Sequence, residues 1–491
     1  MHAIETAFRL VFDFQVLGVI LASAMFGMFV GAMPGLTATM ATALLVPVTF
    51  FMAPVPALGA IVTATAMAIF AGDIPAAMLR MPGTPASAAY ADESYEMTKK
   101  GQLDLCMGTN LVFSVLGGIF GVVVLILLAP VLAEVAINFS SFEYFWLACL
   151  GLTCAVFIGT GDPVKGLLSL FVGLAIGCIG IDPAAGQARF TFGNVDLLSG
   201  INFIPTLIGM FAVSELLRGA VTLDKGLTMV QQHVGNLLSG IGGVWRKYWK
   251  NFFRGSILGT VIGALPGAGA DIAAWVSYAV SKKLSKEPEK FGTGHIEGIV
   301  DSTSANNAAL GGAWIPALVF GIPGDSITAI VIGVLYMKGM NPGPSVFLQT
   351  PELIYAVFII FILANIVMFP LGWAAIKSAK QILRVPRNIL LPVILIFCMV
   401  GSFAMTNSLY GVVLMVVMGV FGWLLEEHGI PVAPLILGLV LGEMLEQNFM
   451  TLMIKADGSF LVFFERPIAG VLGVCPLVIW GFMLWRILPF G

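Results

Sequence analysis

The chain has 491 residues, of which 58% are hydrophobic and 10% are charged, and its mean hydropathy is +0.98. About a quarter of the residues in an ordinary soluble domain are charged, so this composition excludes a soluble globular protein. The formal net charge of −3 gives no support to nucleic-acid binding.

Apolar stretches close to the bilayer-spanning length of about 20 residues recur along the whole chain. By this length criterion we expect an all-α, multi-pass membrane protein with about twelve to fourteen membrane-entering segments. The first stretch follows Arg9 and has no small-residue cleavage site, which favours an uncleaved membrane helix over a signal peptide. Examples of these stretches are residues 14–32, 107–137, 164–181, 353–376 and 467–488.

Two Pro-Gly pairs interrupt the apolar sequence of the first half, and each has a counterpart in the second half. GMFVGAMPGLTAT holds Pro34-Gly35 and GTVIGALPGAGAD holds Pro266-Gly267, 232 residues later (266 minus 34). IPAAMLRMPG ends at Pro82-Gly83 and IPALVFGIPG at Pro323-Gly324, 241 residues later (323 minus 82). A duplicated chain with matching helix breaks is typical of secondary transporters, in which the solute binds at the repeat interface.

The duplication extends beyond these breaks. KGLLSLFVGLAIG from Lys165 is similar to YGVVLMVVMGVFG from Tyr410, and PTLIG from Pro205 matches PLILG from Pro434. We therefore predict a first repeat over residues 1–225, a connector over 226–244 and a second repeat over 245–491. The connector is expected in the cytoplasm, and the aromatic and basic run WRKYWKNFFR that follows it predicts an interfacial helix.

The placement of Lys and Arg indicates that the two repeats are inserted in opposite directions. Matching loops of the first half, residues 50–58 and 134–144, contain neither Lys nor Arg. Basic loops stay in the cytoplasm, so equivalent loops are expected on opposite sides, with 254–282 forming a re-entrant hairpin broken at Pro266-Gly267. The basic residues in two second-half loops are Lys282, Lys283, Lys286 and Lys290, and then Lys377, Lys380, Arg384 and Arg387.

Short polar side chains surround the Pro-Gly breaks. Helix N-termini at such breaks present N–H groups to an anion, and freed carbonyls with small hydroxyls can ligate a sodium ion. The alternative interpretation is that the breaks are ordinary turns, in which Ser, Thr and Asp cap the next helix. The polar residues concerned are Thr37, Thr39, Thr84, Asp271, Asp325 and Ser326.

Three aspartates, Asp73, Asp271 and Asp325, lie in or beside apolar sequence. A charge at the bilayer centre costs about 2.5 to 3.5 kcal/mol, so each requires a cation, a proton or a cluster of donors unless it lies at the interface or caps a helix. The segment FGTGHIEGIVDSTSANNAALGG adds hydroxyls and two amides, including Ser304, Asn306 and Asn307, which can contact a carboxylate or a cation. Helix capping is again the alternative.

No cofactor or metal centre is predicted, apart from a sodium ion at the same loops. The six cysteines are scattered through apolar sequence without a C-x-x-C spacing, and the four histidines are isolated. This pattern is typical of buried cysteines rather than of a metal site.

The runs EGIVDSTSANNAALGGAWIPALVFGIPGDS, GALPGAGA and MPGTPASAA resemble the large membrane subunit of the tripartite tricarboxylate transporter family, and the likeness covers nearly the whole chain. The resemblance implies a permease of the bacterial inner membrane. It implies two partners, a small membrane subunit and a periplasmic solute-binding protein that delivers a carboxylate. It also implies coupling to a Na⁺ or H⁺ gradient without ATP, and the chain has no Walker-type glycine loop.

The resemblance directs attention to the two pairs of breaks and to Asn306-Asn307. The chain departs from the family pattern where Ala71-Gly72-Asp73 replaces Gly-Gly-Ser, where Ser302-Thr303 stands for an acid, and where Asp271 replaces a small residue. These departures leave the solute and the coupling ion open. The candidate solute and ion site comprises Pro34, Gly35, Thr37, Thr39, Asp73, Pro82, Gly83, Thr84, Pro266, Gly267, Asp271, Ser304, Asn306, Asn307, Pro323, Gly324, Asp325 and Ser326.

Two other functions compete with this prediction. A passive channel requires a continuous polar pore, which paired half-helices do not suggest. An intramembrane aspartyl protease is hinted at by GTGD ending at Asp162 and by Pro316-Ala317-Leu318. The chain has no Tyr-Asp pair to supply the partner acid, and one carboxylate cannot be general acid and general base together.

Overall fold

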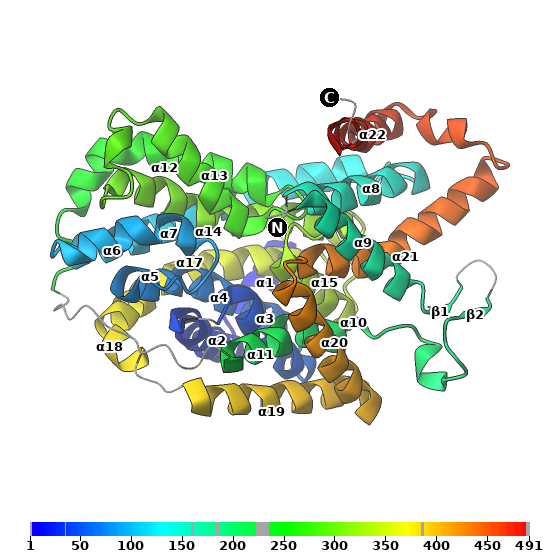
Figure 1. Ribbon diagram of the computed structural model, residues 1–491, viewed down its shortest axis with the longest axis horizontal. Helices are drawn as coiled ribbons and strands as arrows, with labels where there is room; N and C mark the ends of the chain where they lie inside the picture. The colour runs from blue at the N-terminus through cyan, green and yellow to red at the C-terminus, as the bar shows by residue number, and fades with distance from the viewer. Residues whose placement is uncertain are drawn as a thin grey trace.

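The computed structural model describes residues 2–34, 36–158, 162–182, 186–221, 235–383 and 387–487, and Figure 1 shows their arrangement. The described chain is almost entirely helical. Its two strands form one antiparallel pair in which Gly180 is opposite Arg189.

The first half consists of helices of very different lengths. The longest is α7 with 34 residues, and a six-residue π-helical segment, η3, links α10 to α11. The elements are α1 (His2–Val11), α2 (Phe14–Ala32), α3 (Ala38–Phe50), α4 (Pro54–Ala71), α5 (Asp73–Leu79), η1 (Ser87–Tyr90), α6 (Ala91–Lys99), α7 (Leu103–Ala136), α8 (Ser141–Ile158), α9 (Pro163–Gly177), β1 (Gly180–Ile181), β2 (Ala188–Arg189), η2 (Val195–Leu197), α10 (Phe203–Leu207), η3 (Ile208–Val213) and α11 (Ser214–Val221).

The second half begins inside the predicted connector, because α12 starts at Ile241, while residues 226–234 lie outside the described residues. The last helix, α22, packs against α8 of the first half. The elements are α12 (Ile241–Gly263), α13 (Gly269–Leu284), η4 (Pro288–Lys290), α14 (Ile296–Phe320), α15 (Ser326–Met337), α16 (Val346–Gln349), α17 (Pro351–Lys377), α18 (Ala379–Ile382), α19 (Arg387–Thr406), α20 (Leu409–Glu427), α21 (Val432–Lys455), η5 (Phe460–Phe464) and α22 (Pro467–Ile487).

An all-α, multi-pass membrane protein is confirmed. In the described part of the chain, seven helices are long and apolar enough to cross a membrane, and six further apolar helices have 10 to 17 residues. Together these are thirteen apolar helices (seven plus six) among the described residues, within the range of about twelve to fourteen membrane-entering segments expected. The seven are Phe14–Ala32, Pro54–Leu79, Leu103–Ala136, Phe203–Val221, Pro351–Lys377, Leu409–Glu427 and Val432–Lys455.

The Pro-Gly pairs end helices at the predicted positions. Helices α5 and α14 stop at Leu79 and Phe320, each three residues before its proline, and α12 stops at Gly263, three residues before Pro266. Proline has no N–H to continue the helix, and it disfavours helical backbone in the residue before it. The breaks are therefore true interruptions of helices rather than kinks.

The same close helix contact occurs once in each half. In the first half α2 packs on α4, and a Cβ added to Gly27 would lie 2.2 Å from the carbonyl oxygen of Ala64. In the second half α12 packs on α14, and a Cβ on Gly259 would lie 2.2 Å from that of Ala305. Small residues let backbones approach in a membrane, and both pairs are offset by the same 232 and 241 residues as the Pro-Gly pairs.

The breaks themselves pack in matching ways. A Cβ on Gly83 would lie 2.4 Å from the carbonyl oxygen of Gly31, and a Cβ on Gly324 would lie 2.7 Å from that of Gly263. In each half, therefore, the loop after the second break lies against the end of the helix that precedes the first break. Glycine is required at both positions because a side chain would collide with backbone.

Loops from the two halves meet in crossed pairs. The ammonium of Lys338 donates to the carbonyl oxygens of Phe50 at 2.8 Å and Met52 at 2.6 Å, so the loop after α15 lies beside the loop after α3. Lys100 donates to the carbonyl oxygen of Thr293 at 2.5 Å, so the loop after α6 lies beside the loop before α14. By chain position, the loop after α3 corresponds to the loop after α13. Each of these two loops lies beside a loop of the other half.

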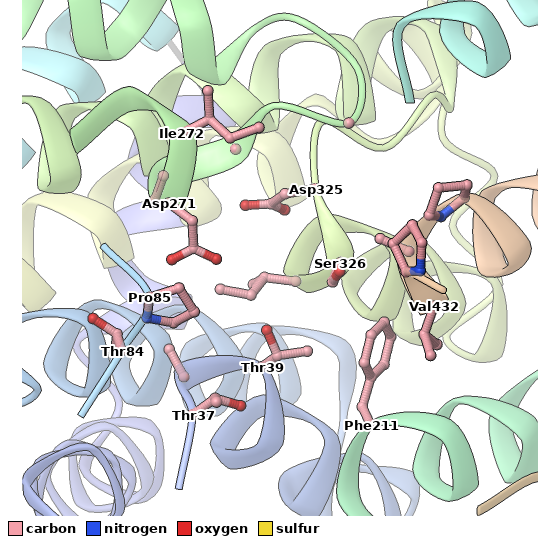
Figure 2. Close-up of a pocket in the computed structure, with 18 of the residues that line it drawn as sticks. Thr37, Thr39, Thr84, Pro85, Phe211, Asp271, Ile272, Asp325, Ser326 and Val432 are labelled. Carbon is pink, nitrogen blue, oxygen red and sulfur yellow. The ribbon is translucent and has the colours of Figure 1, made fainter. Parts of the chain in front are cut away.

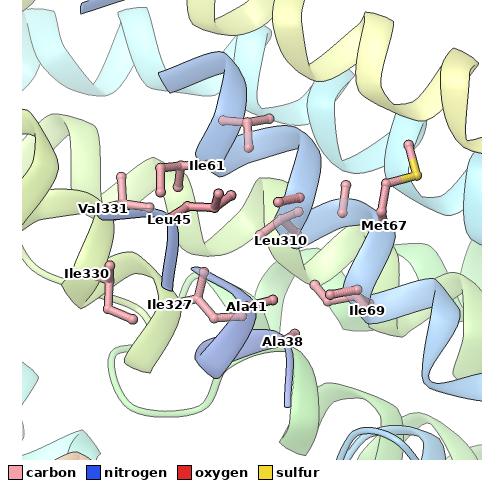
Figure 3. Close-up of a cluster of buried hydrophobic side chains, with 14 of the residues drawn as sticks. Ala38, Ala41, Leu45, Ile61, Met67, Ile69, Leu310, Ile327, Ile330 and Val331 are labelled. Carbon is pink, nitrogen blue, oxygen red and sulfur yellow. The ribbon is translucent and has the colours of Figure 1, made fainter. Parts of the chain in front are cut away.

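The apolar core connects the halves. Figure 3 shows side chains from α3 and α4 of the first half packed with side chains from α14 and α15 of the second half. All of them are at most 8% exposed, and they belong to one continuous cluster. This core holds the broken ends of α3, α14 and α15 close together. The labelled residues are Ala38, Ala41, Leu45, Ile61, Met67, Ile69, Leu310, Ile327, Ile330 and Val331.

Candidate functional site

A cavity of about 460 Å³ lies where the broken helices of both halves meet. Its volume is in the range typical of small-molecule sites. The first half contributes the start of α3, the loop after Pro82-Gly83, and part of η3 and α11. The second half contributes the starts of α13 and α15, one residue of α14, and the turn between α20 and α21.

Eight of the predicted site residues line this cavity. In Figure 2 the carboxyl groups of Asp271 and Asp325 point into the space between the halves, and Thr37, Thr39 and Thr84 lie across from them. The sequence therefore identified residues that are distant in the chain and adjacent in the structure. The eight are Thr37, Thr39, Thr84, Gly267, Asp271, Asn306, Asp325 and Ser326.

The tips of the two second-half breaks are bonded to each other. The N–H of Gly267 donates to the carbonyl oxygen of Gly324 at 2.8 Å. Gly267 has φ +84°, and a Cβ there would lie 2.4 Å from the Cα of Ala155, so both the backbone conformation and the space demand glycine. This bond holds the starts of α13 and α15 at the same wall of the cavity.

Helix capping, the alternative interpretation of the polar residues, applies at two positions. The hydroxyl of Thr37 accepts from the N–H of Met40 at 3.1 Å at the start of α3. The carboxylate of Asp325 accepts from the N–H of Thr328 at 2.8 Å, and the Thr328 hydroxyl accepts from the N–H of Asp325 at 2.9 Å. Both caps also line the cavity, so capping and a role in the site coexist.

Asp271 joins the two halves at the cavity. Its carboxylate, in the first turn of α13, accepts from the N–H of Ala86 at 3.1 Å, in the loop after Pro82-Gly83. One turn later, the indole N–H of Trp275 donates to the carbonyl oxygen of Pro85 at 3.2 Å. The start of α13 is thus fixed to the first half by polar bonds as well as by packing.

More acidic than basic side chains line the cavity. Its described lining includes four carboxylates, Glu215, Asp271, Asp325 and Glu426, and one cationic side chain, Arg218. Arg218 donates to Glu215 at 3.1 Å and also to Glu426. Sequence reasoning did not place Arg218 and Glu426 in the site. The one sequence signal that could have indicated these residues was an acidic residue near the end of an apolar run in each half.

The other predicted residues surround the cavity without lining it. The prolines and the two glycines build the turns, while Asp73, Ser304 and Asn307 lie buried behind the wall. The hydroxyl of Ser304 donates to the carbonyl oxygen of Val300 at 2.6 Å, and the amide of Asn307 donates to that of Thr303 at 3.3 Å, both within α14. Gly35 lies outside the described residues. The turn residues are Pro34, Pro82, Gly83, Pro266, Pro323 and Gly324.

The described structure also bears on a metal site and on Asp162, the residue that the protease interpretation invoked. Among the described residues there is no group of three or more His, Cys, Asp or Glu side chains placed to hold a metal ion. Asp162 is exposed and caps α9, where its carboxylate accepts from the N–H of Val164 at 2.9 Å.

The comparisons with known proteins agree with this architecture. The model of the tripartite tricarboxylate transporter TctA family matches residues 17–437. The chain belongs to this family. The resemblance that the sequence motifs suggested is confirmed, and the family makes the protein a subunit of a tripartite tricarboxylate transporter. Membership of a transporter family points to a role in transport rather than in catalysis.

Two relatives of this TctA-family protein come from Agrobacterium vitis. One, described as an uncharacterized 52.8 kDa protein in the TAR-I ttuC' 3'region, is 35% identical over 446 residues, 91% of this chain and 88% of the relative. The other, described as an uncharacterized protein in the TAR-II ttuC' 3'region, is 37% identical over 189 residues, 38% of this chain and 78% of the relative. No solved structure matches this TctA-family protein.

Proposed function

We propose that this protein is the permease that imports a di- or tricarboxylate across the bacterial inner membrane, driven by a Na⁺ or H⁺ gradient. A periplasmic solute-binding protein delivers the solute, and a small membrane subunit completes the complex. Both partners follow from membership of a tripartite family. The cavity between the broken helices is where solute and coupling cation meet.

The charge of the cavity is the observation that carries this proposal. Four carboxylates and one guanidinium line it, and the guanidinium is already paired with two of the carboxylates. A solute with two or three negative charges is repelled from such a site unless cations enter with it. The site therefore supports coupling in this proposal: cations offset the acidic residues, and helix N-termini and hydroxyls contact the solute.

The placement of the basic residues supports two repeats of opposite orientation around the cavity. The loop after α3 contains no Lys or Arg, whereas its counterpart, the loop after α13, is rich in lysine. The loop after α3 bonds to Lys338 and the loop before α14 bonds to Lys100, a crossed pairing that either orientation of the repeats allows. Opposite insertion lets the same cavity open alternately to each side, with the basic loops in the cytoplasm.

An uptake assay tests the proposal. Right-side-out vesicles that contain the permease and both partners are given labelled citrate, malate, succinate or tartrate under imposed sodium or pH gradients. We expect one or more of these to accumulate above the external concentration and to leak out when an ionophore collapses the gradient. Equilibration without accumulation would indicate a channel, and no uptake of any member of the panel would contradict a carboxylate permease.

A matched pair of variants localises the function to the cavity. Asp271→Asn keeps an acceptor for the N–H of Ala86 but removes a charge from the cavity wall, so we expect altered dependence of uptake on the cation. Asp162→Asn removes the charge of an exposed capping acid outside the cavity and should leave uptake unchanged. Equal behaviour of the two variants would argue against this site.

A further inference from the structure

Among the described acids of the first half, Glu93 and Asp73 are both 0% exposed, and they differ sharply in their surroundings. Glu93 in α6 accepts four hydrogen bonds, from the backbone N–H groups of Gly292, Gly294 and His295 and from the hydroxyl of Tyr278, at 2.5 to 2.8 Å. Neither oxygen of this carboxyl group is left without a donor. Glu93 is thus a structural link between α6 and the loop before α14.

Asp73, at the start of α5, has two hydroxyls beside it, those of Tyr90 and Ser87. The hydroxyl of Tyr90 donates to its Oδ1 at 2.6 Å, while its Oδ2 is buried without a hydrogen-bond partner. An ionised carboxylate in an apolar interior without further compensation is so costly that such groups take up a proton instead. Asp73 therefore lacks the set of hydrogen-bond donors that surrounds Glu93. Its charge must be compensated by a proton or by a basic side chain.

A short polar path joins Asp73 to the cavity. The side-chain amide of Asn306 lies 3.5 Å from the hydroxyl of Tyr90, and Asn306 itself lines the cavity. The Oδ1 of Asn306 is also buried without a donor. A proton on Oδ2 of Asp73 would turn that unpartnered acceptor into a hydroxyl and remove the charge of the buried carboxylate.

Among the described residues, no basic side chain is placed to take this role. On the elements packed against α5, the titratable groups near Asp73 are Tyr90 of η1 and Cys106 of α7, which in turn adjoins Glu93 of α6, and none of them is basic. Helices α2 and α4, which also pack on α5, carry no titratable residue. The nearby basic residues, Arg80 and Lys99, are paired at the surface with Asp92 and Glu96 respectively.

We propose that Asp73 binds one proton inside the membrane, reached from the cavity through Asn306 and Tyr90, and that this proton crosses with the solute. The second part rests on the proposed function, whereas the first does not. In the step itself, a proton from the cavity adds to a carboxylate oxygen of Asp73. It returns to the cavity by the same path once the cavity has opened to the other side of the membrane. No bond between heavy atoms forms or breaks.

Infrared difference spectroscopy of the purified protein tests the first part without any transport. We expect a carbonyl band of a protonated carboxylic acid that is absent in Asp73→Asn, that moves to higher frequency in Tyr90→Phe because its hydrogen-bond donor is lost, and that is unchanged in Glu93→Gln. The band should persist when sodium is added at constant pH. A band that Asp73→Asn leaves intact, or that sodium abolishes, would overturn the proposal.

Vesicle transport tests the second part, with whichever carboxylate of the panel the unmodified protein accumulates. Asn is uncharged like a protonated Asp, so we expect Asp73→Asn to exchange internal for external solute at the normal rate but to lose accumulation driven by a pH gradient. Glu93→Gln, a buried acid without this role, should keep that accumulation in whatever protein remains folded. Full pH-driven accumulation by Asp73→Asn would overturn the coupling role, even where the permease function itself holds.

Discussion

Arg218 of α11 donates a hydrogen bond to the carboxylate of Glu426 of α20, so an ion pair joins the two halves at the wall of the cavity. The same guanidinium donates to Glu215 at 3.1 Å. Its side chain is 38% exposed and those of the two acids are 15% and 28% exposed, so the cluster is only partly buried. It nevertheless compensates part of the negative charge of the cavity.

Replacement of Arg218 by Gln leaves the two acids of this cluster without their cation. Because the pairs are partly exposed, we expect a loss of roughly 1 kcal/mol in stability, measured by thermal unfolding in detergent. If the loss of the ion pairs weakens solute binding by about 1.4 kcal/mol, the affinity, and with it uptake at low solute concentration, should fall about tenfold. Adding Glu426→Gln should recover part of the stability, since one unpaired carboxylate is removed.

The matched control for this prediction is Arg80→Gln. Arg80 forms an exposed pair with Asp92 away from the cavity, so its loss should change neither uptake nor stability appreciably. If Arg218→Gln transports as well as Arg80→Gln, the cluster has no role in the site.

Substitution of the glycines at the repeated helix contact should be equally harmful in both halves. An added methyl at Gly27 or Gly259 would lie 2.2 Å from a carbonyl oxygen of the facing helix. We expect Gly27→Ala and Gly259→Ala each to destabilise the protein by about 1 to 3 kcal/mol, the usual effect of overpacking. Thermal unfolding and the yield of monodisperse protein measure this effect.

Each of these glycines has a control on its own helix. Gly18 in α2 and Gly242 in α12 have no atom within 4 Å of an added Cβ, so Gly18→Ala and Gly242→Ala should be neutral or slightly stabilising. If Gly27→Ala were as stable as Gly18→Ala, or Gly259→Ala as stable as Gly242→Ala, the close contact on that helix would be contradicted.

Two substitutions of Asp325 separate its capping role from its charge. Asn is as good a helix cap as Asp, so Asp325→Asn should keep the stability of the protein, whereas Asp325→Ala should lose about 1 kcal/mol. Both remove a negative charge from the cavity and should alter the cation dependence of uptake in the same direction. A change of transport confined to the Ala variant would mean that only the cap matters.

The sequence predicted the helical class and the breaks well because both depend on local chemistry. The Pro-Gly pairs combine a residue without an N–H and one of high backbone freedom, which favours a helix end, and the apolar stretches are long enough to be recognised without any partner. The repeat offsets also hold for a contact that the sequence did not predict, since Gly259 and Ala305 occupy the positions of Gly27 and Ala64.

Contacts between the halves were beyond sequence reasoning. Glu426 and Arg218 are 208 residues apart, and nothing near either residue indicates the other. Asp73 was expected among the loops of the site, yet it lies behind the cavity wall, because α5 continues almost directly from α4 as a buried helix before the break. Only the fold shows that Tyr90 is its hydrogen-bond donor.

The opposite insertion of the two repeats is tested most directly by single-cysteine labelling in intact cells. Starting from a variant without its six cysteines, Phe51→Cys and Lys286→Cys place one thiol in each of two equivalent, exposed loops. We predict that a membrane-impermeant maleimide labels Phe51→Cys in intact cells and labels Lys286→Cys only after the membrane is opened. Labelling of both from the same side of the membrane would contradict inverted repeats and the alternating-access cavity built on them.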